Sequence, residues 1–421
     1  AEAFSRVLED EPENPPALYH RGLALIGTRR YLEAAGSLEK ALALSPSADA
    51  WYQLGIARER LGKFGEAVEA LDKAIRLEPD RAPAWCVRGV ALARGGAHGG
   101  AIGAFERAIS LGPGNGRAWF GKGYSLQMLG RLPEARDALE RAIGLSYNGL
   151  PVLLRHGLIL EDLGDHSGAV LSFSRAVELD PNSGDGFFHL GLAQLALRKY
   201  EEAVESFGKA VKIQGKASRS WFHLGQAYQE LGRYEEALAP LKEAIRLEPD
   251  NAEARYLEGL ALFRLDRFKK AAGSLAKATK LAPAHAHAWY HLGLARAALD
   301  DAGEAEKAFS RVTELDPSFA PAWYSLGVAE RRLGQGEKAL HALDEALALD
   351  PSIPGGWMEK GLILEDLGRH EDAIPALSRA TQLDPGNALA WLLQGQNLLS
   401  AGRHEEAVHA LDQALTLDRE N

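Results

Sequence analysis

The sequence contains a single cysteine, Cys86, among 421 residues. An internal disulfide is therefore excluded, and an oxidising compartment is neither required nor ruled out. The sequence also lacks an Asn-x-Ser/Thr glycosylation acceptor and any apolar run long enough to span a bilayer. Because a membrane-spanning helix needs such a run, we expect no membrane insertion.

Clusters of positive charge are missing as well. The formal net charge is -10, and the 48 Lys and Arg residues are spread among 58 Asp and Glu residues. A general nucleic-acid binder needs clustered Lys and Arg, so we expect no nucleic-acid partner. With 46% hydrophobic and 25% charged residues, the composition excludes a fully disordered chain.

The sequence begins at Ala1 without an initiator methionine or a signal-like segment. We therefore expect a processed or excised chain. The sequence shows no targeting signal, and a cytoplasmic location is favoured only by default.

All the tryptophans lie in one register with a period of 34 residues: Trp51, Trp85, Trp119, Trp221, Trp289, Trp323, Trp357 and Trp391. Four residues after this register each of twelve repeats has a glycine, and twelve residues later each has an alanine. Leu or Phe follows four residues after the alanine, and proline closes nine of the repeats. Such a period is typical of a solenoid, whose units bury their apolar faces against one another.

Within each half of a repeat, apolar residues recur at steps of three and four, which predicts two helices. A glycine inside a helix costs about 1 kcal/mol relative to alanine, so twelve glycines in one register need a purpose. We infer that the glycine of the first helix faces the alanine of the second and lets the two backbones approach. A second set of glycines is expected to end the first helix in the left-handed conformation: Gly62, Gly130, Gly164, Gly232, Gly334, Gly368 and Gly402.

Two prolines interrupt the expected second helices. Pro240 and Pro375 lie in the interior of the second helix of the seventh and eleventh repeats. An interior proline removes a backbone hydrogen bond and costs roughly 3 kcal/mol, so we expect both helices to be kinked.

The pattern Trp-x2-Leu-Gly followed by Ala, Phe or Leu, Ala and Pro resembles the signature of the tetratricopeptide repeat family. The seventh repeat carries it at Trp221, Leu224, Gly225, Tyr228, Ala237, Leu241, Ala244 and Pro249. The resemblance covers nearly the whole chain. It implies an all-α fold, a right-handed α-solenoid superhelix of twelve helix–turn–helix repeats plus an N-terminal half repeat. The expected boundaries are 1–14 for the half repeat and 15–47, 48–81, 82–115, 116–149, 150–183, 184–217, 218–251, 252–285, 286–319, 320–353, 354–387 and 388–421 for the full repeats.

In this family the first helices line an inner face, and the resemblance places the residue after the tryptophan register on it. Most of these residues are aromatic: Tyr19, Tyr52, Phe120, Phe188, Phe222, Tyr256, Tyr290 and Tyr324. The residue after the glycine is mostly aliphatic, and residues four apart stack into one stripe on a helix. The functional hypothesis is an apolar groove for an extended or helical partner segment. The alternative is that both positions pack against the neighbouring repeat.

Charges on the same face have mixed signs. Arg60, Arg94, Arg264 and Arg332 share one register, in which other repeats have Asp162, Glu230 and Asp366. Mixed signs disfavour a track for phosphates and suit a partner segment with its own charge pattern. The family's Lys–Asn clamp for a C-terminal carboxylate is not expected, because aromatic residues hold the position of its lysine.

Motifs for chemistry are weak. His287 and His291 stand one helical turn apart beside His285 and are a weak candidate metal site that lacks an evident third ligand. The glycines between Gly116 and Gly123 lack the strand and the final Ser/Thr of a phosphate loop. Cys86 has no His or Asp in register to activate it. We therefore expect no enzyme activity and no cofactor.

The first hypothesis for the function is a scaffold that binds a peptide segment or partner protein in its concave groove. A second is a substrate-presenting accessory region of a larger enzyme. A third is a self-assembling structural protein, because the terminal repeats lack the polar caps that solenoids need. In that case homo-oligomers would form through the uncapped terminal repeats.

Overall fold

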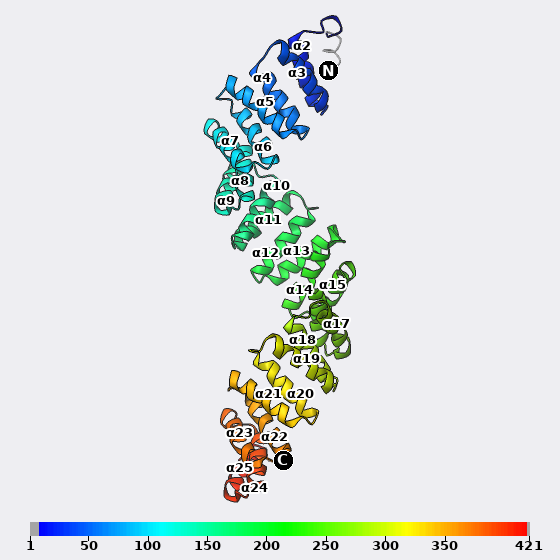
Figure 1. Ribbon diagram of the computed structural model, residues 1–421, viewed down its shortest axis with the longest axis vertical. Helices are drawn as coiled ribbons and strands as arrows, with labels where there is room; N and C mark the ends of the chain where they lie inside the picture. Colours follow the sequence, from blue (N-terminus) through cyan, green and yellow to red (C-terminus); the bar gives the residue numbers. More distant parts are fainter. Residues whose placement is uncertain (1–7, 419–421) are drawn as a thin grey trace. The chain divides into compact units, whose positions relative to one another are not determined.

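The computed structural model describes residues 8–418. In this range every regular element is an α-helix, and the helices follow one another as packed pairs (Figure 1). The predicted all-α fold of consecutive helix pairs is confirmed. The half repeat expected over 1–14 lies partly outside the described residues; within it, residues 8–10 are helical. The chain divides into two compact units, Ala1–Ile213 and Gln214–Asn421.

Unit 1 is built from helices of 13 or 14 residues that form six pairs in its described part. The bounds are α2 (Pro15–Gly27), α3 (Tyr31–Leu44), α4 (Ala48–Arg60), α5 (Phe64–Leu77), α6 (Ala82–Arg94), α7 (His98–Leu111), α8 (Gly116–Met128), α9 (Leu132–Gly144), α10 (Leu150–Asp162), α11 (His166–Leu179), α12 (Gly184–Ala196) and α13 (Tyr200–Ile213).

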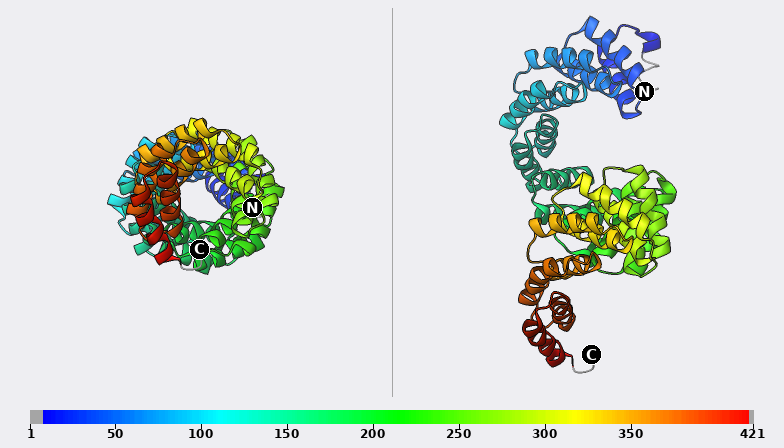
Figure 2. Two further views of the ribbon diagram at one scale, coloured as in Figure 1. Left: turned by 90° about the horizontal axis from the view of Figure 1, so that it is seen from below. Right: turned by 60° about the horizontal axis from the view of Figure 1, so that its bottom comes forward.

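Unit 2 repeats the same arrangement. Its helices are α14 (Ser218–Glu230), α15 (Tyr234–Leu247), α16 (Ala252–Arg264), α17 (Phe268–Leu281), α18 (Ala286–Ala298), α19 (Ala302–Leu315), α20 (Ala320–Arg332), α21 (Gly336–Leu349), α22 (Pro354–Asp366), α23 (His370–Leu383), α24 (Ala388–Ser400) and α25 (His404–Leu417). Contacts are more extensive within a pair, such as α18 and α19, than between pairs, such as α19 and α20. Figure 2 shows these consecutive helices side by side.

The interior glycine of each first helix meets the large apolar residue of the second helix. A methyl group placed on Gly55 would lie 2.5 Å from Cγ of Leu71, and one on Gly293 would lie 2.5 Å from Cε1 of Phe309. Both side chains are almost fully buried. The alanine we expected opposite the glycine contributes its backbone instead, as at Gly327, where the methyl would lie 3.1 Å from the carbonyl oxygen of Ala339. The glycine therefore makes room chiefly for Leu or Phe.

The turns between paired helices adopt the left-handed conformation. The expected glycines all have positive φ, between 71° and 79°. At the same turn of other repeats Arg29, Arg198, Asp266 and Asp300 have φ between 56° and 60°, a region that costs residues other than glycine free energy. The glycine caps are thus confirmed.

The prolines inside second helices do not interrupt them. Pro240 lies within α15 and Pro375 within α23, and each helix is 14 residues long, as are the other second helices of the described range except α9, which has 13. The surrounding packing therefore holds both helices together despite the lost backbone donor.

Candidate partner-binding surface

The first helices of neighbouring repeats lie beside one another within each unit. In unit 1, α4 contacts both α2 and α6; in unit 2, α18 contacts both α16 and α20. Among the described residues, no second helix makes a comparable contact with the next second helix. The first helices are therefore crowded along one side of each unit, which we call the inner face, while the second helices spread along the outer face.

The aromatic stripe expected on this face is half-buried. Tyr19, Tyr52, Phe120, Phe222, Tyr256, Tyr290 and Tyr324 are all partly exposed, whereas Phe188 is 7% exposed and packs near Phe207, with ring centres 6.0 Å apart. The aliphatic residues one turn later, such as Leu260, Leu294 and Val328, are also partly exposed. Apart from Phe188, each aromatic ring thus contributes to packing between repeats and keeps part of its surface open to solvent.

Three phenols of the stripe, those of Tyr52, Tyr256 and Tyr324, have a raised pKa, which favours their neutral form. Burial raises the pKa of Tyr52, Tyr256 and Tyr324, and the charge of a nearby acid, Glu253 for Tyr256 and Glu359 for Tyr324, raises it further. The Arg81 guanidinium lies 4.5 Å from the centre of the Tyr52 ring. Its positive charge acts against burial and lowers the pKa of Tyr52. Neutral phenols offer a partner both an apolar ring and a hydroxyl donor.

Two of the four predicted arginines, Arg60 and Arg94, form ion pairs with a buried acid. Glu59 is 3% exposed and its carboxylate lies 3.4 Å from the Arg60 side chain and 2.5 Å from that of Arg94. Arg264 is exposed, and the Arg332 side chain, 51% exposed, lies 3.8 Å from the exposed Asp300. The cations of unit 2 are therefore more available to a partner than those of unit 1.

A set of polar contacts joins neighbouring repeats and was not predicted from the sequence. Each joins residues 28 positions apart: Arg155 donates to Gln127 at 2.5 Å, and Arg331 donates to Glu359 at 2.9 Å. His189 lies 3.4 Å from Glu161 in the same arrangement. Complementary residue types at this spacing are the sequence signal that could have revealed them. These contacts occupy part of the inner face with the chain's own side chains.

The candidate metal residues have other partners. Nδ1 of His291 lies 2.9 Å from the His287 carbonyl oxygen, and His285 caps α18 through Nδ1 while its Nε2 lies 3.1 Å from Glu253. Burial lowers the pKa of His291. Within residues 8–418, no cluster of three or more His, Cys, Asp or Glu side chains is placed to hold a metal ion. The three histidines offer a partner aromatic rings and hydrogen-bonding groups.

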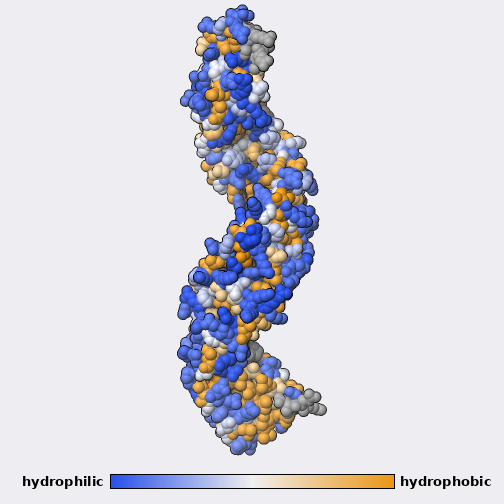
Figure 3. Space-filling model, turned by 90° about the vertical axis from the view of Figure 1, so that its right-hand side faces the viewer, coloured by the Kyte–Doolittle hydropathy of each residue, from blue (hydrophilic) through white to orange (hydrophobic). Residues whose placement is uncertain are grey.

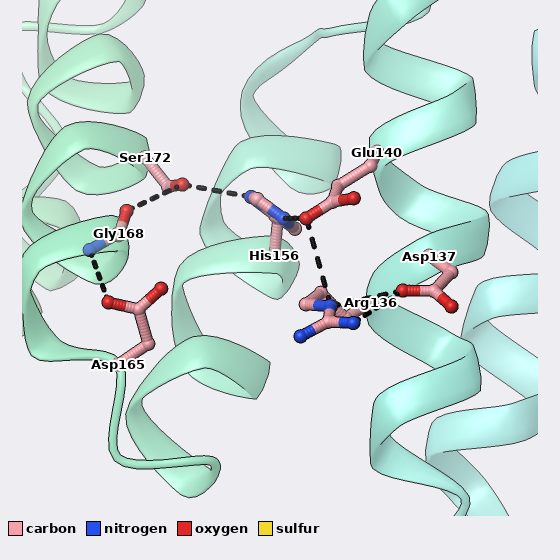
Figure 4. Close-up of polar contacts among 7 residues, drawn as sticks. All are labelled: Arg136, Asp137, Glu140, His156, Asp165, Gly168 and Ser172. Atoms are coloured by element: carbon pink, nitrogen blue, oxygen red, sulfur yellow. Dashed lines mark hydrogen bonds and ion pairs between the residues drawn. The ribbon is translucent and has the colours of Figure 1, made fainter.

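Between α9, α10 and α11 the structure does bring an acid, a histidine and a serine together. Nδ1 of His156 lies 2.9 Å from Oγ of Ser172, and Nε2 lies 3.9 Å from Glu140 (Figure 4). The Ser172 hydroxyl donates its proton to the carbonyl oxygen of Gly168 at 3.1 Å, so it accepts from His156. A general base must instead accept the proton of its nucleophile. This geometry is therefore structural and does not activate Ser172.

The single thiol is also poorly suited to nucleophilic chemistry. Cys86 is 4% exposed, and burial raises the pKa of its thiol against the opposing effects of Arg117 and Asn115. Reactive cysteines need a lowered pKa and access to solvent. Cys86 instead packs in the same hydrophobic core cluster as Phe105.

Three family models, each described as tetratricopeptide repeat, match nearly the whole chain. The first matches residues 1–49, 52–116, 101–148, 222–286, 256–318, 290–354, 324–388 and 358–421, the second 182–250 and the third 150–183. The chain therefore belongs to the tetratricopeptide repeat family. Membership supports a role as a scaffold for protein–protein interaction.

Similar proteins were found in sequence and in structure. Over 81 residues the chain is 33% identical to the Protein CTR9 homolog of Arabidopsis thaliana, a match that covers 19% of this chain and only 7% of that protein. YrrB, described as a TPR protein with an unusual peptide-binding site, is 27% identical, with 42% of this chain and 92% of YrrB covered and a TM-score of 0.40. A chain in the crystal structure of the APC/C hetero-tetramer Cut9-Hcn1 is 16% identical, with 94% of this chain and 92% of that chain covered and a TM-score of 0.42.

The helices in the described range are also short. None of them is both long enough and apolar enough to cross a membrane.

Proposed function

We propose that this chain is a binding scaffold that holds a segment of a partner protein along the inner face of its helix pairs. The observation that carries the proposal is the half-exposed stripe of aromatic and aliphatic side chains, repeated at the same register of successive first helices. A continuous apolar stripe differs from the scattered single apolar residues that any surface shows.

Unit 2 supports the proposal best. Tyr256, Tyr290 and Tyr324 follow one another at intervals of 34 residues on α16, α18 and α20, all partly exposed. Rigid aromatic rings bury a large area on binding and lose little conformational entropy, which is why they often dominate binding energies. The exposed Arg264 and Arg332 add positive charge to the same face. An acidic, apolar segment is therefore the partner that this face fits.

Selection of peptides from a displayed random library tests the proposal directly. Peptides enriched on the unaltered protein should lose most of their affinity for the variant Tyr256→Ala, Tyr290→Ala, Tyr324→Ala. A matched variant changes three exposed apolar residues of second helices, Leu179→Ala, Leu281→Ala and Leu349→Ala, and should bind as before. Circular dichroism verifies that both variants keep their helices. Equal affinity of the tyrosine variant and the unaltered protein for every selected peptide would refute the groove.

A second candidate function is self-association through the last helix pair. Val408 and Leu415 on α25 are 58% and 52% exposed, whereas Ile374 and Leu347, at the same registers of earlier second helices, are 6% and 5% exposed. Hydrophobic surface gathers at this end of unit 2 (Figure 3). An exposed apolar face of this kind is typical of an interaction surface.

Sedimentation at increasing protein concentration distinguishes the two candidates. If α25 mediates self-association, the unaltered protein forms concentration-dependent dimers, and Val408→Glu with Leu415→Glu gives monomers. Monomers of the unaltered protein at all concentrations would reject self-association and leave the proposed groove unaffected.

A further inference from the structure

A pocket opens on the inner face of unit 2 between α18 and α20. Its volume is about 290 Å³, and Leu294, Tyr324 and Val328 form part of its wall. Phe309 of α19, which is 1% exposed, also lines it. Arg332 lines the pocket as well, and its side chain is half exposed. The pocket is thus an apolar cavity with one cation on its border.

The pocket exists because two small residues end α18. Ala297 and Ala298 line it, and both are alanine in this repeat alone among those of unit 2. At the register of Ala297 the preceding repeat has Phe263 and the following one has Arg331; at that of Ala298 they have Arg264 and Arg332. Side chains of that size would occupy the space that the two methyl groups leave open.

The size and lining favour a single large apolar side chain as the occupant. Apolar cavities of about 150 Å³ already hold a benzene ring, whereas pockets for drug-sized ligands span roughly 300–1,000 Å³. The lining offers water few hydrogen bonds, and Ser325 already donates its hydroxyl proton to the carbonyl oxygen of Pro321 at 2.8 Å. Burying an aromatic or aliphatic side chain here is therefore favourable.

The cation at the border selects what stands next to that side chain. Arg332 approaches Asp300 at 3.8 Å, and the Asp300 side chain is 97% exposed, so this ion pair contributes little free energy. Its neighbour Arg331 is more firmly engaged, at 2.9 Å from Glu359 and 3.5 Å from Asp366. The guanidinium of Arg332 is therefore the one that a partner's carboxylate can reach and bind through two hydrogen bonds.

We infer that this pocket is the anchor point of the groove, and that it takes a Phe-sized apolar side chain of a partner segment next to an Asp or Glu whose carboxylate binds Arg332. The inference rests on the proposed function. The stripe continues on both sides of the pocket, at Tyr290 of α18 and along α22 at Leu362. The acid is therefore a side chain within a continuous segment, and a chain end is not needed.

The test uses an N-acetylated, C-amidated peptide, Ser-Gly-Ser-(4-fluoro-Phe)-Glu-Ser-Gly, observed by ¹⁹F NMR during titration with the full chain. The same peptide with Gln in place of Glu should bind roughly fivefold more weakly. A third peptide without Glu but with a free C-terminal carboxylate next to the fluorinated ring should bind no better than the Gln peptide.

Two substitutions locate the binding. Ala297→Phe introduces the residue that α16 carries at this register, fills the pocket, and should weaken binding more than about tenfold. Arg332→Gln should remove the preference for Glu over Gln and leave the fluorinated ring bound. Arg311→Gln on α19, whose partner Glu314 lies on the outer surface at 2.6 Å, is the control and should change neither result.

The outcomes separate the pocket from the groove. Three results would contradict the pocket as an anchor point: the Glu peptide does not bind at millimolar protein, Ala297→Phe binds it as tightly as the unaltered chain, or Arg332→Gln keeps the preference for the Glu peptide. The inference is also wrong if the free-carboxylate peptide binds as well as the Glu peptide. Library peptides that depend on the three tyrosines but not on Ala297 would uphold the groove and reject the pocket.

Discussion

The indole Nε1 of Trp289 donates a hydrogen bond to the carbonyl oxygen of Pro283 at 3.0 Å. Trp289 belongs to α18, whereas Pro283 lies in the turn that closes the preceding repeat. The same bond recurs at 2.9 Å between Trp323 and Pro317. These two tryptophans therefore do more than fill space, because each ties its own first helix to the turn before it.

Replacing this tryptophan tests the tie. Trp289→Phe keeps an aromatic ring but removes the donor, so the free energy of unfolding of unit 2 should fall by about 1 kcal/mol. The ring itself fits, because Phe187 occupies the same register in the sixth repeat. Urea unfolding followed by circular dichroism measures the change. An unaltered midpoint would mean that the bond makes no net contribution.

Adding a methyl group at an interior glycine should destabilise the fold. Gly293→Ala would place its Cβ 2.5 Å from Phe309, which is 1% exposed and cannot move aside. Overpacking of this kind costs about 1–3 kcal/mol. Gly273 in α17 has no atom within 4 Å of an added methyl, so Gly273→Ala should instead stabilise by up to about 1 kcal/mol. Thermal unfolding of both variants gives the comparison, and equal shifts of the same sign would contradict it.

Glu330 should make stability depend on pH. Its carboxylate is 6% exposed, and Oε2 has no hydrogen-bond partner among the described residues. Burial raises the pKa of Glu330 and the nearby Glu306 raises it further, while Lys338 and His341 oppose them. The folded state therefore keeps the proton at pH values where the unfolded chain has lost it, and stability falls as the pH rises through this window.

The variant Glu330→Gln lacks this charge. Its free energy of unfolding should exceed that of the unaltered chain by about 1 kcal/mol at neutral pH. The difference should shrink as the pH falls through the raised pKa of Glu330. Glu345→Gln, at an exposed position of α21, serves as the control. A difference that is constant with pH would show that Glu330 is not the titrating group.

The contact between Arg331 and Glu359 should couple neighbouring repeats. Their side chains are 29% and 14% exposed and 2.9 Å apart, so they are less screened than a surface pair. A double-mutant cycle with Arg331→Gln and Glu359→Gln should give a coupling of about 1 kcal/mol. The exposed pair Arg311 and Glu314 within α19 should give less than about 0.5 kcal/mol. Equal couplings would argue against a special role for the contact across repeats.

Periodicity predicted what lies within a repeat. The phase of Trp221, Gly225 and Ala237 gave the helix pair, and the positions of Gly62 and Gly232 gave the left-handed turns, because these features depend on local backbone conformation. The partner of the interior glycine was assigned incompletely: at Gly55 it is the Leu71 side chain. Spacing along the chain shows which residues share a helix face but does not determine how far each side chain reaches.

Contacts between repeats could not be predicted from the periodicity. The bond from Trp289 to Pro283 and the contact of Arg331 with Glu359 depend on the rotation and translation that relate one helix pair to the next. The pocket beside Ala297 arises in the same way, because an alanine makes a cavity only where the neighbouring helix leaves the space unfilled. The predicted stripe and its arginines could be named from the register, whereas their differing availability required the positions of Glu59 and Asp300.

The bond from Trp289 to the preceding turn has a practical consequence for cutting and grafting this protein. A fragment that starts at the first residue of α18 would contain Trp289 but leave Pro283 behind, and its leading indole would lose its acceptor. Transplanted modules should therefore carry the closing turn of the preceding neighbour, starting near Leu281. Recombination that respects this overlap would deliver modules whose first helix is already anchored.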